Sequence, residues 1–323
     1  MYAPYALFIH TIKERVKKNQ KKLTETLSKL QKVWYNRRER ILIKEIHLET
    51  PFDFSKHSTI GCGGKAKQAY YPQSEEELCF LLGQLPERPF VLGNMSNVLP
   101  MDEDTEKTVL CTKKMTDIRR EDDCIFVQAG VTSGRLMRYL QSVGLGGVEF
   151  LAGIPCTMGG ILFMNGGAGG IYISDWVESV RIYREGKLVE LSRAECGYAY
   201  KESVFMHTKD VILGARLRLK HSTPQAVKEE TRRFLAKRAH LPKGKSMGCV
   251  FQNPQGYTAG ALIEAAGLKG LRIGGATVST QHANFIINDQ NATARDIRSL
   301  IARMKDEVWQ RHGVVLEEEI RYL

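Results

Sequence analysis

The chain has 323 residues, of which 43% are hydrophobic and 26% charged, and its formal net charge is +11. These are ordinary values for a globular protein, and the length predicts about two domains with a substantial core. No apolar run approaches the roughly 18 residues that a membrane-spanning helix needs, and the apolar part of the N-terminus precedes its charges, the reverse of a secretory signal. Composition therefore argues against a membrane span and favours a cytoplasmic enzyme.

Most of the positive charge lies in residues 11–44, where twelve Lys and Arg face three Glu, a local balance of +9. Apolar residues recur there at spacings of seven, four, three and four, namely Val16, Leu23, Leu27, Leu30 and Trp34. This spacing predicts one apolar stripe of a helix. We expect a basic helical extension over residues 1–45 that packs on the body, with its charged face in solvent. Binding to nucleic acid or to an anionic membrane is the alternative, and we expect no nucleic-acid partner.

The seven cysteines form no CxxC pair and show no regular spacing; they are Cys62, Cys79, Cys111, Cys124, Cys156, Cys196 and Cys249. Reduced thiols of a cytosolic chain explain this pattern better than disulfides or a zinc site. We therefore expect no bound metal.

From about residue 46 the pattern alternates short strands and helices. Gly61 to Ala66 fits the dinucleotide motif G-x-G-x-x-A, but the following KQAYYP is strand-like, so no helix is expected to receive a pyrophosphate. The next segment, SEEELCFLLGQL, predicts a helix in which Ser74 and Glu77 have capping-box spacing. RPFVLGNMSNVLP then predicts a strand, a tight loop and a second strand.

The stretch from Gly147 to Gly170 is unusually rich in glycine, with glycines at positions 153, 159, 160, 166, 167, 169 and 170. Glycines permit positive φ and leave N–H groups uncovered, as a buried phosphate or a flat cofactor ring requires. Asn165 in the same run can both donate and accept hydrogen bonds. A glycine-rich turn between strands is the structural alternative.

This stretch, GIPCTMGGILFMNGGAGG, resembles the flavin-binding signature of the bacterial UDP-N-acetylenolpyruvoylglucosamine reductases (UDP-N-acetylmuramate dehydrogenases). Three further segments match that family in the same order: LGNMSNVL, then GCVFQNP with AGALIEAAGLKGLRIGGATVSTQHANFIIN, and finally LEEEIR. The resemblance covers roughly residues 46–323. Gly169 stands where one branch of the family has a tyrosine over the substrate, so the chain resembles the branch that lacks this tyrosine.

The resemblance implies an α+β fold. It places a two-part FAD-binding domain of the vanillyl-alcohol-oxidase and para-cresol-methylhydroxylase type at 46–220, split near 108, and a substrate-binding domain with a catalytic tail at 221–323. It also implies FAD, held noncovalently since neither flavin loop contains histidine. The expected cofactor-binding residues are Gly93, Asn94, Met95, Ser96, Asn97, Gly153, Ile154, Pro155, Thr157, Gly159, Gly160, Asn165 and Gly167. Met95 and Cys156 replace glycines of the family, and their side chains would crowd the cofactor unless they point away.

The implied reaction is the reduction of the enolpyruvyl ether of UDP-N-acetylglucosamine to UDP-N-acetylmuramate, in peptidoglycan synthesis and hence in cell shape and division. No side chain carries a hydride, so NADPH would reduce the flavin, and the flavin would reduce the substrate. Three residues match the family's catalytic set: Lys201, usually an arginine that meets the substrate carboxylate; Cys249, usually the proton-donating serine; and Glu319, with Glu317 as the alternative. Taken singly, each has a structural alternative: a solvated lysine, a core thiol or an exposed acid.

Asn253, His282 and Asn284 are polar residues within apolar stretches, and we expect them to line the substrate site; a buried structural role is the alternative. Two other functions stay open at this point. The chain could be a flavin oxidoreductase for another small molecule, or a noncatalytic binder of flavin or UDP-sugar.

Every matched motif lies after residue 45, so residues 1–44 should be dispensable for flavin binding and turnover. Their deletion should leave the flavin absorbance spectrum and NADPH-dependent activity largely intact. Loss of FAD from a soluble, folded truncation would show that the extension takes part in the flavin site.

Overall fold

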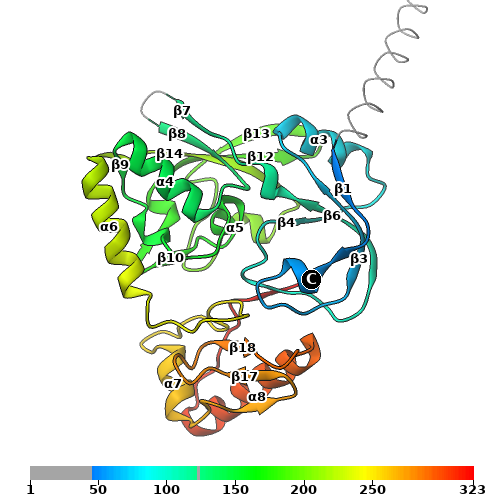
Figure 1. Cartoon of the computed structure of the whole chain (residues 1–323), viewed down its shortest axis with the longest axis vertical. Coiled ribbons are helices and arrows are strands. Elements are labelled where there is room, and N and C mark those ends of the chain that lie inside the picture. The colour runs from blue at the N-terminus through cyan, green and yellow to red at the C-terminus, as the bar shows by residue number, and fades with distance from the viewer. Residues whose placement is uncertain (1–45, 122–123) are drawn as a thin grey trace, which may run out of the picture. The chain divides into compact units, whose positions relative to one another are not determined.

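The structure is a computed structural model that describes residues 46–121 and 124–323. The basic helical extension expected over residues 1–45 lies outside the described residues. Residues Leu48–Leu323 form one compact unit, and many of its elements are labelled in Figure 1.

A first sheet has the strand order β1-β3-β6-β4, with β2 paired to β3. Its elements are β1 (His47–Glu49), β2 (Phe52–Asp53), α2 (Phe54–His57), β3 (Lys65–Tyr71), α3 (Glu75–Gln84), β4 (Phe90–Leu92) and β6 (Thr105–Cys111). Strands β3, β6 and β4 run parallel. Strand β3 begins at Lys65, within the glycine motif, so the strand expected after the motif is confirmed and no helix follows it among the described residues.

Helix α3 begins as expected, because the Ser74 hydroxyl accepts a hydrogen bond from the Glu77 N–H at 3.2 Å. The reciprocal half of the capping box is displaced by one residue. The Glu77 carboxylate accepts from the N–H of Gln73 at 2.8 Å rather than from that of Ser74.

The second sheet is antiparallel, in the order β13-β12-β14-β8-β7. Its strands and helices are β7 (Ile118–Glu121), β8 (Cys124–Gln128), α4 (Ser133–Val143), α5 (Met158–Phe163), β12 (Val177–Arg184), β13 (Lys187–Ser192), β14 (Val211–Leu217) and α6 (Pro224–Lys237). Helix α5 packs on β8 and β14, and α4 packs on α6. Strand β8, which lies between β14 and β7, is buried at every position. The guanidinium groups of Arg119 and Arg181 cover its Phe126 ring, at 4.9 and 4.7 Å from the centroid.

Shorter elements complete this part of the chain. They are η1 (Thr112–Lys114), β9 (Leu145–Gly146), η2 (Glu149–Leu151), β10 (Gly167–Ala168), β11 (Ile171–Tyr172), η3 (Ile173–Asp175), η4 (Val204–Met206) and β15 (Lys220–His221). Strand β9 pairs with β15, and β10 with β11.

The C-terminal part is a small three-stranded sheet with helices. It consists of α7 (Ala259–Ala265), β16 (Arg272–Ile273), β17 (Ala276–Val278), β18 (Ile286–Asn288) and α8 (Ala294–His312). Helix α8 begins at a complete capping box formed by Thr293 and Asp296, and Gly313 ends it in the left-handed conformation. It packs on β16 and β17.

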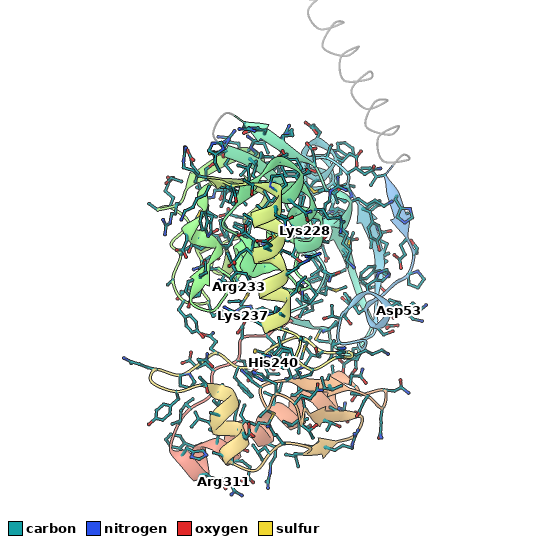
Figure 2. The ribbon with its side chains drawn as sticks, turned by 60° about the vertical axis from the view of Figure 1, so that its left-hand side comes forward. Asp53, Lys228, Arg233, Lys237, His240 and Arg311 are labelled. Carbon is teal, nitrogen blue, oxygen red and sulfur yellow. The ribbon has the colours of Figure 1, made fainter. Side chains whose placement is uncertain are left out.

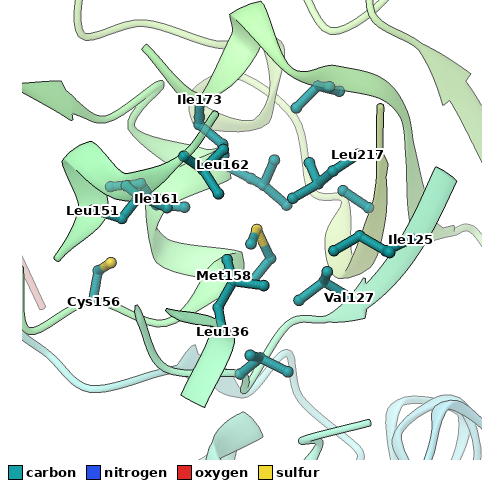
Figure 3. Packing of buried hydrophobic residues seen from close by; sticks show 14 of the residues in the cluster. Ile125, Val127, Leu136, Leu151, Cys156, Met158, Ile161, Leu162, Ile173 and Leu217 are labelled. Atoms are coloured by element: carbon teal, nitrogen blue, oxygen red, sulfur yellow. The ribbon is translucent and has the colours of Figure 1, made fainter. Parts of the chain in front are cut away.

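Three hydrophobic cores correspond to these three layers, and Figure 3 shows part of the largest. Val227 of α6 belongs to that largest core, with Phe234 packed against it, so α6 is part of the second sheet's layer. This packing favours a boundary of the C-terminal domain after α6, later than the expected 220/221. It likewise favours dividing the FAD-binding part between β6 and β7, a few residues after 108. We propose these boundaries in place of the expected ones.

The C-terminal domain is joined to the first sheet at several points. Strand β19 (Arg321–Tyr322) pairs in parallel with β5 (Val98–Leu99), and Leu323 packs against the core of the first sheet. The Asp102 carboxylate accepts hydrogen bonds from the N–H groups of Ala294 and Arg295, at 2.7 and 3.0 Å, at the start of α8. These contacts hold β5 and the segment that follows it against the C-terminal domain.

Among residues 46–121 and 124–323, no helix has the length and apolar character needed to cross a membrane.

Candidate active site

Two glycine-containing loops meet at the centre of the candidate site. The first, Gly93–Asn97, joins β4 to β5, and the second, residues 153–160, leads into α5. A Cβ added to Gly93 would lie 2.2 Å from the Thr157 hydroxyl oxygen, so only glycine fits there. The Asn94 amide donates to the Pro155 carbonyl at 2.9 Å, which fixes one loop against the other.

The first loop contains a row of backbone N–H groups without an acceptor in the part of the protein that the structure describes. Among the described residues, the N–H groups of Asn94, Met95, Ser96 and Asn97 have no hydrogen-bond acceptor. Consecutive free N–H groups form a concave site for anionic oxygens such as those of a pyrophosphate. The loops therefore fit a phosphate-bearing, flat cofactor such as FAD, and the assignment of these residues to the cofactor stays a prediction.

The two side chains that replace family glycines do not fill this site. Met95 has φ 49° and is only 4% exposed, because its side chain packs into the core of the first sheet. Cys156 is buried in the core of the second sheet. Both side chains point away from the exposed backbone of the loops, so the crowding that the sequence raised does not arise.

Other predicted cofactor positions fix the backbone of the second loop and of the glycine segment after it. Gly153 has φ +77°, and the N–H of Gly159 donates to the Ala129 carbonyl at 2.8 Å. Asn165 is buried; its amide donates to the Ala199 carbonyl at 2.7 Å and its oxygen accepts from the Ser174 N–H. Asn165 thus ties the glycine segment to the backbone just before Lys201.

The three predicted catalytic residues come together from distant segments. The Lys201 ammonium lies 2.6 Å from Glu319 Oε1, and the side chains are only 14% and 15% exposed. Glu319 is held by its backbone as well: its N–H donates to Val250, and its carbonyl accepts from the Asn97 amide at 2.9 Å. Glu317 is exposed, so the geometry favours Glu319 of the two.

Cys249 lies within the electrostatic reach of this ion pair. Burial, and to a smaller extent the Glu319 carboxylate, raise the pKa of the Cys249 thiol to about 11 against the opposing effect of Lys201 and Arg238. A thiol with this pKa keeps its proton at neutral pH. Cys249 is therefore suited to donate a proton rather than to attack as a thiolate.

The three predicted substrate residues have different environments. Asn253 is exposed, and its backbone N–H donates to the Tyr200 hydroxyl at 3.2 Å. Asn284 is buried, and its amide pairs in both directions with the backbone of Phe251, at 2.9 and 2.8 Å. Asn284 thereby fixes the strand segment that carries Cys249. Whether it also binds substrate stays a prediction.

His282 is half-buried, and its Nδ1 accepts from the Asn284 N–H at 3.3 Å. Burial lowers the pKa of His282, and the charge of His240 lowers it further, so the ring is neutral at neutral pH. Its role as a substrate ligand also stays a prediction.

The sequence did not single out Arg238 or Tyr200 as functional residues. Arg238 caps the C-terminal end of α6, and its side chain would lie 3.4 Å from a Cβ at Gly153. Tyr200 is 45% exposed and makes an edge contact with Tyr172. For Tyr200 the sequence offers a signal of function, because this residue precedes Lys201 in the YKES segment. For Arg238 it offers none, because the basic amphipathic pattern around it is typical of an ordinary helix surface.

The raised pKa of Cys249 predicts its reactivity. Its alkylation rate by iodoacetamide should rise about tenfold per pH unit from about pH 8 to 10 without a plateau, because a free thiol titrates near pH 8.5 but this one titrates near 11. The rate is followed by mass spectrometry of the Cys249 peptide, with circular dichroism as the control for folding. A plateau near pH 9 would contradict the buried, protonated thiol.

The chain matches known families in both of its larger parts. Residues 66–192 match the family described as "FAD binding domain", and residues 239–323 match "UDP-N-acetylenolpyruvoylglucosamine reductase, C-terminal domain". These matches confirm FAD as the cofactor and the α+β fold, with an FAD-binding domain followed by a C-terminal domain.

Curated relatives and a solved structure agree with these matches. The UDP-N-acetylenolpyruvoylglucosamine reductase of Prochlorococcus marinus is 38% identical over 296 residues, 87% of this chain and 95% of that protein. That of Thermotoga maritima is 35% identical over 273 residues, 82% of this chain and 95% of that protein. The crystal structure of UDP-N-acetylenolpyruvylglucosamine reductase from Thermus caldophilus has a TM-score of 0.74 at 32% identity, covering 86% of this chain and 99% of that one. The chain therefore belongs to the UDP-N-acetylenolpyruvoylglucosamine reductase family.

Proposed function

We propose that the chain is an FAD-dependent UDP-N-acetylmuramate dehydrogenase. It uses NADPH to reduce the enolpyruvyl ether of UDP-N-acetylglucosamine to UDP-N-acetylmuramate, a precursor of peptidoglycan, in the cytoplasm. The observation that carries the proposal is the convergence of Lys201, Cys249 and Glu319 next to the loop that holds Asn97.

Bound FAD would supply the hydride carrier that no side chain can provide. The residues of the two loops, Gly93–Asn97 and 153–167, would hold it through backbone N–H groups and through the close approach that glycine permits. Cys249 would then hold a proton at Sγ and deliver it to the substrate carbon that bears the carboxylate.

The ion pair prepares Cys249 for this step. Burial, helped by the Glu319 carboxylate, disfavours the thiolate of Cys249, so the thiol carries its proton before the substrate arrives. Lys201 fixes Glu319 with one N–H and has two further donors for a substrate carboxylate. Negative charge that develops on the substrate therefore meets a positioned ammonium group.

Two alternatives make different predictions for one experiment. In this experiment, NADPH is added anaerobically to the flavin-loaded protein, and the enolpyruvyl sugar nucleotide follows. The proposed enzyme loses its flavin absorbance with NADPH and regains it with the substrate. An oxidoreductase for another small molecule is reduced but not reoxidised, and a noncatalytic binder shows neither step.

Substitution of Cys249 tests the chemistry itself. Because a positioned general acid contributes about 10²- to 10⁴-fold to the rate, Cys249→Ala should slow substrate-dependent flavin reoxidation by roughly that factor. NADPH should still bleach the flavin at a near-normal rate, since this step precedes proton donation.

Cys249→Ser is the matched variant for that test. A hydroxyl can hold and deliver the same proton, so serine should recover much of the lost rate. Rapid reoxidation by the alanine variant would remove Cys249 from the mechanism and leave it as a core thiol.

A further inference from the structure

The C-terminal tail, residues 314–323, carries Glu319, and its backbone is paired with the segment that contains the candidate proton donor. Glu318 forms an antiparallel bridge with Phe251, and the Glu319 N–H donates to the Val250 carbonyl at 2.8 Å. These backbone contacts fix how far along that segment the tail lies. They leave the direction of the Glu319 side chain to other contacts.

The neighbouring carboxylate, that of Glu318, is bound at both of its oxygens. The Lys305 ammonium donates to Oε1 at 2.8 Å, and the Tyr322 hydroxyl donates to Oε2 at 2.5 Å. Burial alone would raise the pKa of the Glu318 carboxyl, but the hydrogen bonds from Lys305 and Tyr322 outweigh it and the pKa is lowered. Glu318 is therefore an ionised carboxylate whose two oxygens are fixed in place.

Helix α8 supplies the support for this carboxylate. Arg298 and Lys305 are seven residues apart and so lie on one face of the helix. The Arg298 guanidinium covers the Tyr322 ring at 5.5 Å from its centroid, while Lys305 binds Glu318. Figure 2 labels Arg311 in the last turn of α8, and from that end the tail returns along the same helix.

Glu318 and Glu319 have partners on different elements. Glu318 is bound by Lys305 of α8, whereas Glu319 is 2.6 Å from the Lys201 ammonium. Side chains of consecutive residues in an extended segment point to opposite sides, so fixing one of them sets the direction of the other. The contacts of Glu318 with α8 therefore limit rotation of the tail about its own axis.

We propose that Glu318 is a positioning residue, whose carboxylate, held by Lys305 and Tyr322, directs Glu319 toward Lys201. This inference rests on the proposed function, in which the Lys201–Glu319 pair acts on the substrate. Glu318 itself contacts α8 and the end of the tail, so it acts through Glu319.

Removal of the Glu318 carboxylate should slow one half-reaction and spare the other. Misplacing a reacting group by about 1 Å can cost about 100-fold, so Glu318→Ala should slow substrate-dependent flavin reoxidation by about 10- to 100-fold. Bleaching of the flavin by NADPH should stay near the wild-type rate, because the pair acts on the substrate. Both steps are followed by flavin absorbance in stopped flow on the FAD-loaded protein.

A double substitution tests whether Glu318 acts through Glu319. In a Glu319→Gln background, Glu318→Ala should change the reoxidation rate by less than about twofold, because residues that act as one unit are not additive. Losses that multiply would show that Glu318 acts independently of Glu319 and would overturn the proposal.

Substitutions on α8 provide the second variant and the controls. Lys305→Met leaves the tail sequence intact and should reproduce part of the loss, so it serves as the test if Glu318→Ala does not retain FAD. Lys305→Arg keeps the cation and should restore most of the rate. Asp306→Asn removes an exposed carboxylate from the next position of the helix and should leave both half-reactions unchanged.

Alkylation of Cys249 by iodoacetamide gives a readout that needs no substrate. Because the tail pairs with the segment after Cys249, its release in Glu318→Ala should accelerate alkylation at least about threefold. Wild-type rates of alkylation and reoxidation, or equal slowing of both half-reactions, would overturn the proposal. Failure of the proposed function is seen separately, since the wild-type protein would then not be reoxidised by the enolpyruvyl substrate.

Discussion

The candidate active site depends on the ion pair between Lys201 and Glu319, which joins segments 118 residues apart. Removing two charges from water costs free energy, and a short contact with further hydrogen bonds is needed to offset that cost. Here the contact is 2.6 Å, and the Glu319 backbone is bound on both sides, to Val250 and to Asn97. The C-terminal tail is thereby held next to the first loop, and the substrate domain is held next to the FAD-binding domain.

The same pair sets the charge around the thiol. Glu319 favours the protonated form of Cys249, and its own charge is balanced by Lys201, so the pair adds no net charge to the site. The site therefore combines one protonated donor, the Cys249 thiol, with an ion pair whose charges balance.

The loops that would hold FAD tolerate Met95 and Cys156 in place of glycine because both side chains are buried in hydrophobic cores. Met95 adopts φ 49°, a strained conformation for a residue other than glycine, and burial of its side chain in a packed core offsets the strain. Cys156 is likewise turned into a core. In both places the side chain is buried in a core, so the departure from glycine adds no side chain to the surface of the loop.

The sequence by itself determined the family, the cofactor, the start of α3 at Ser74, and the strand and loop arrangement around Gly93–Asn97, because these follow from ordered motifs and from local patterns of caps and glycines. It also named Lys201, Cys249 and Glu319, but only through resemblance. Only the tertiary structure showed that Lys201 forms an ion pair with Glu319 and that Asn284 hydrogen-bonds to the backbone of Phe251. It also showed that the Arg238 side chain packs beside Gly153. The physical reason is that each contact joins residues far apart in the chain. The packing of sheets and helices decides which of these side chains face each other. Spacing along the sequence does not encode that packing.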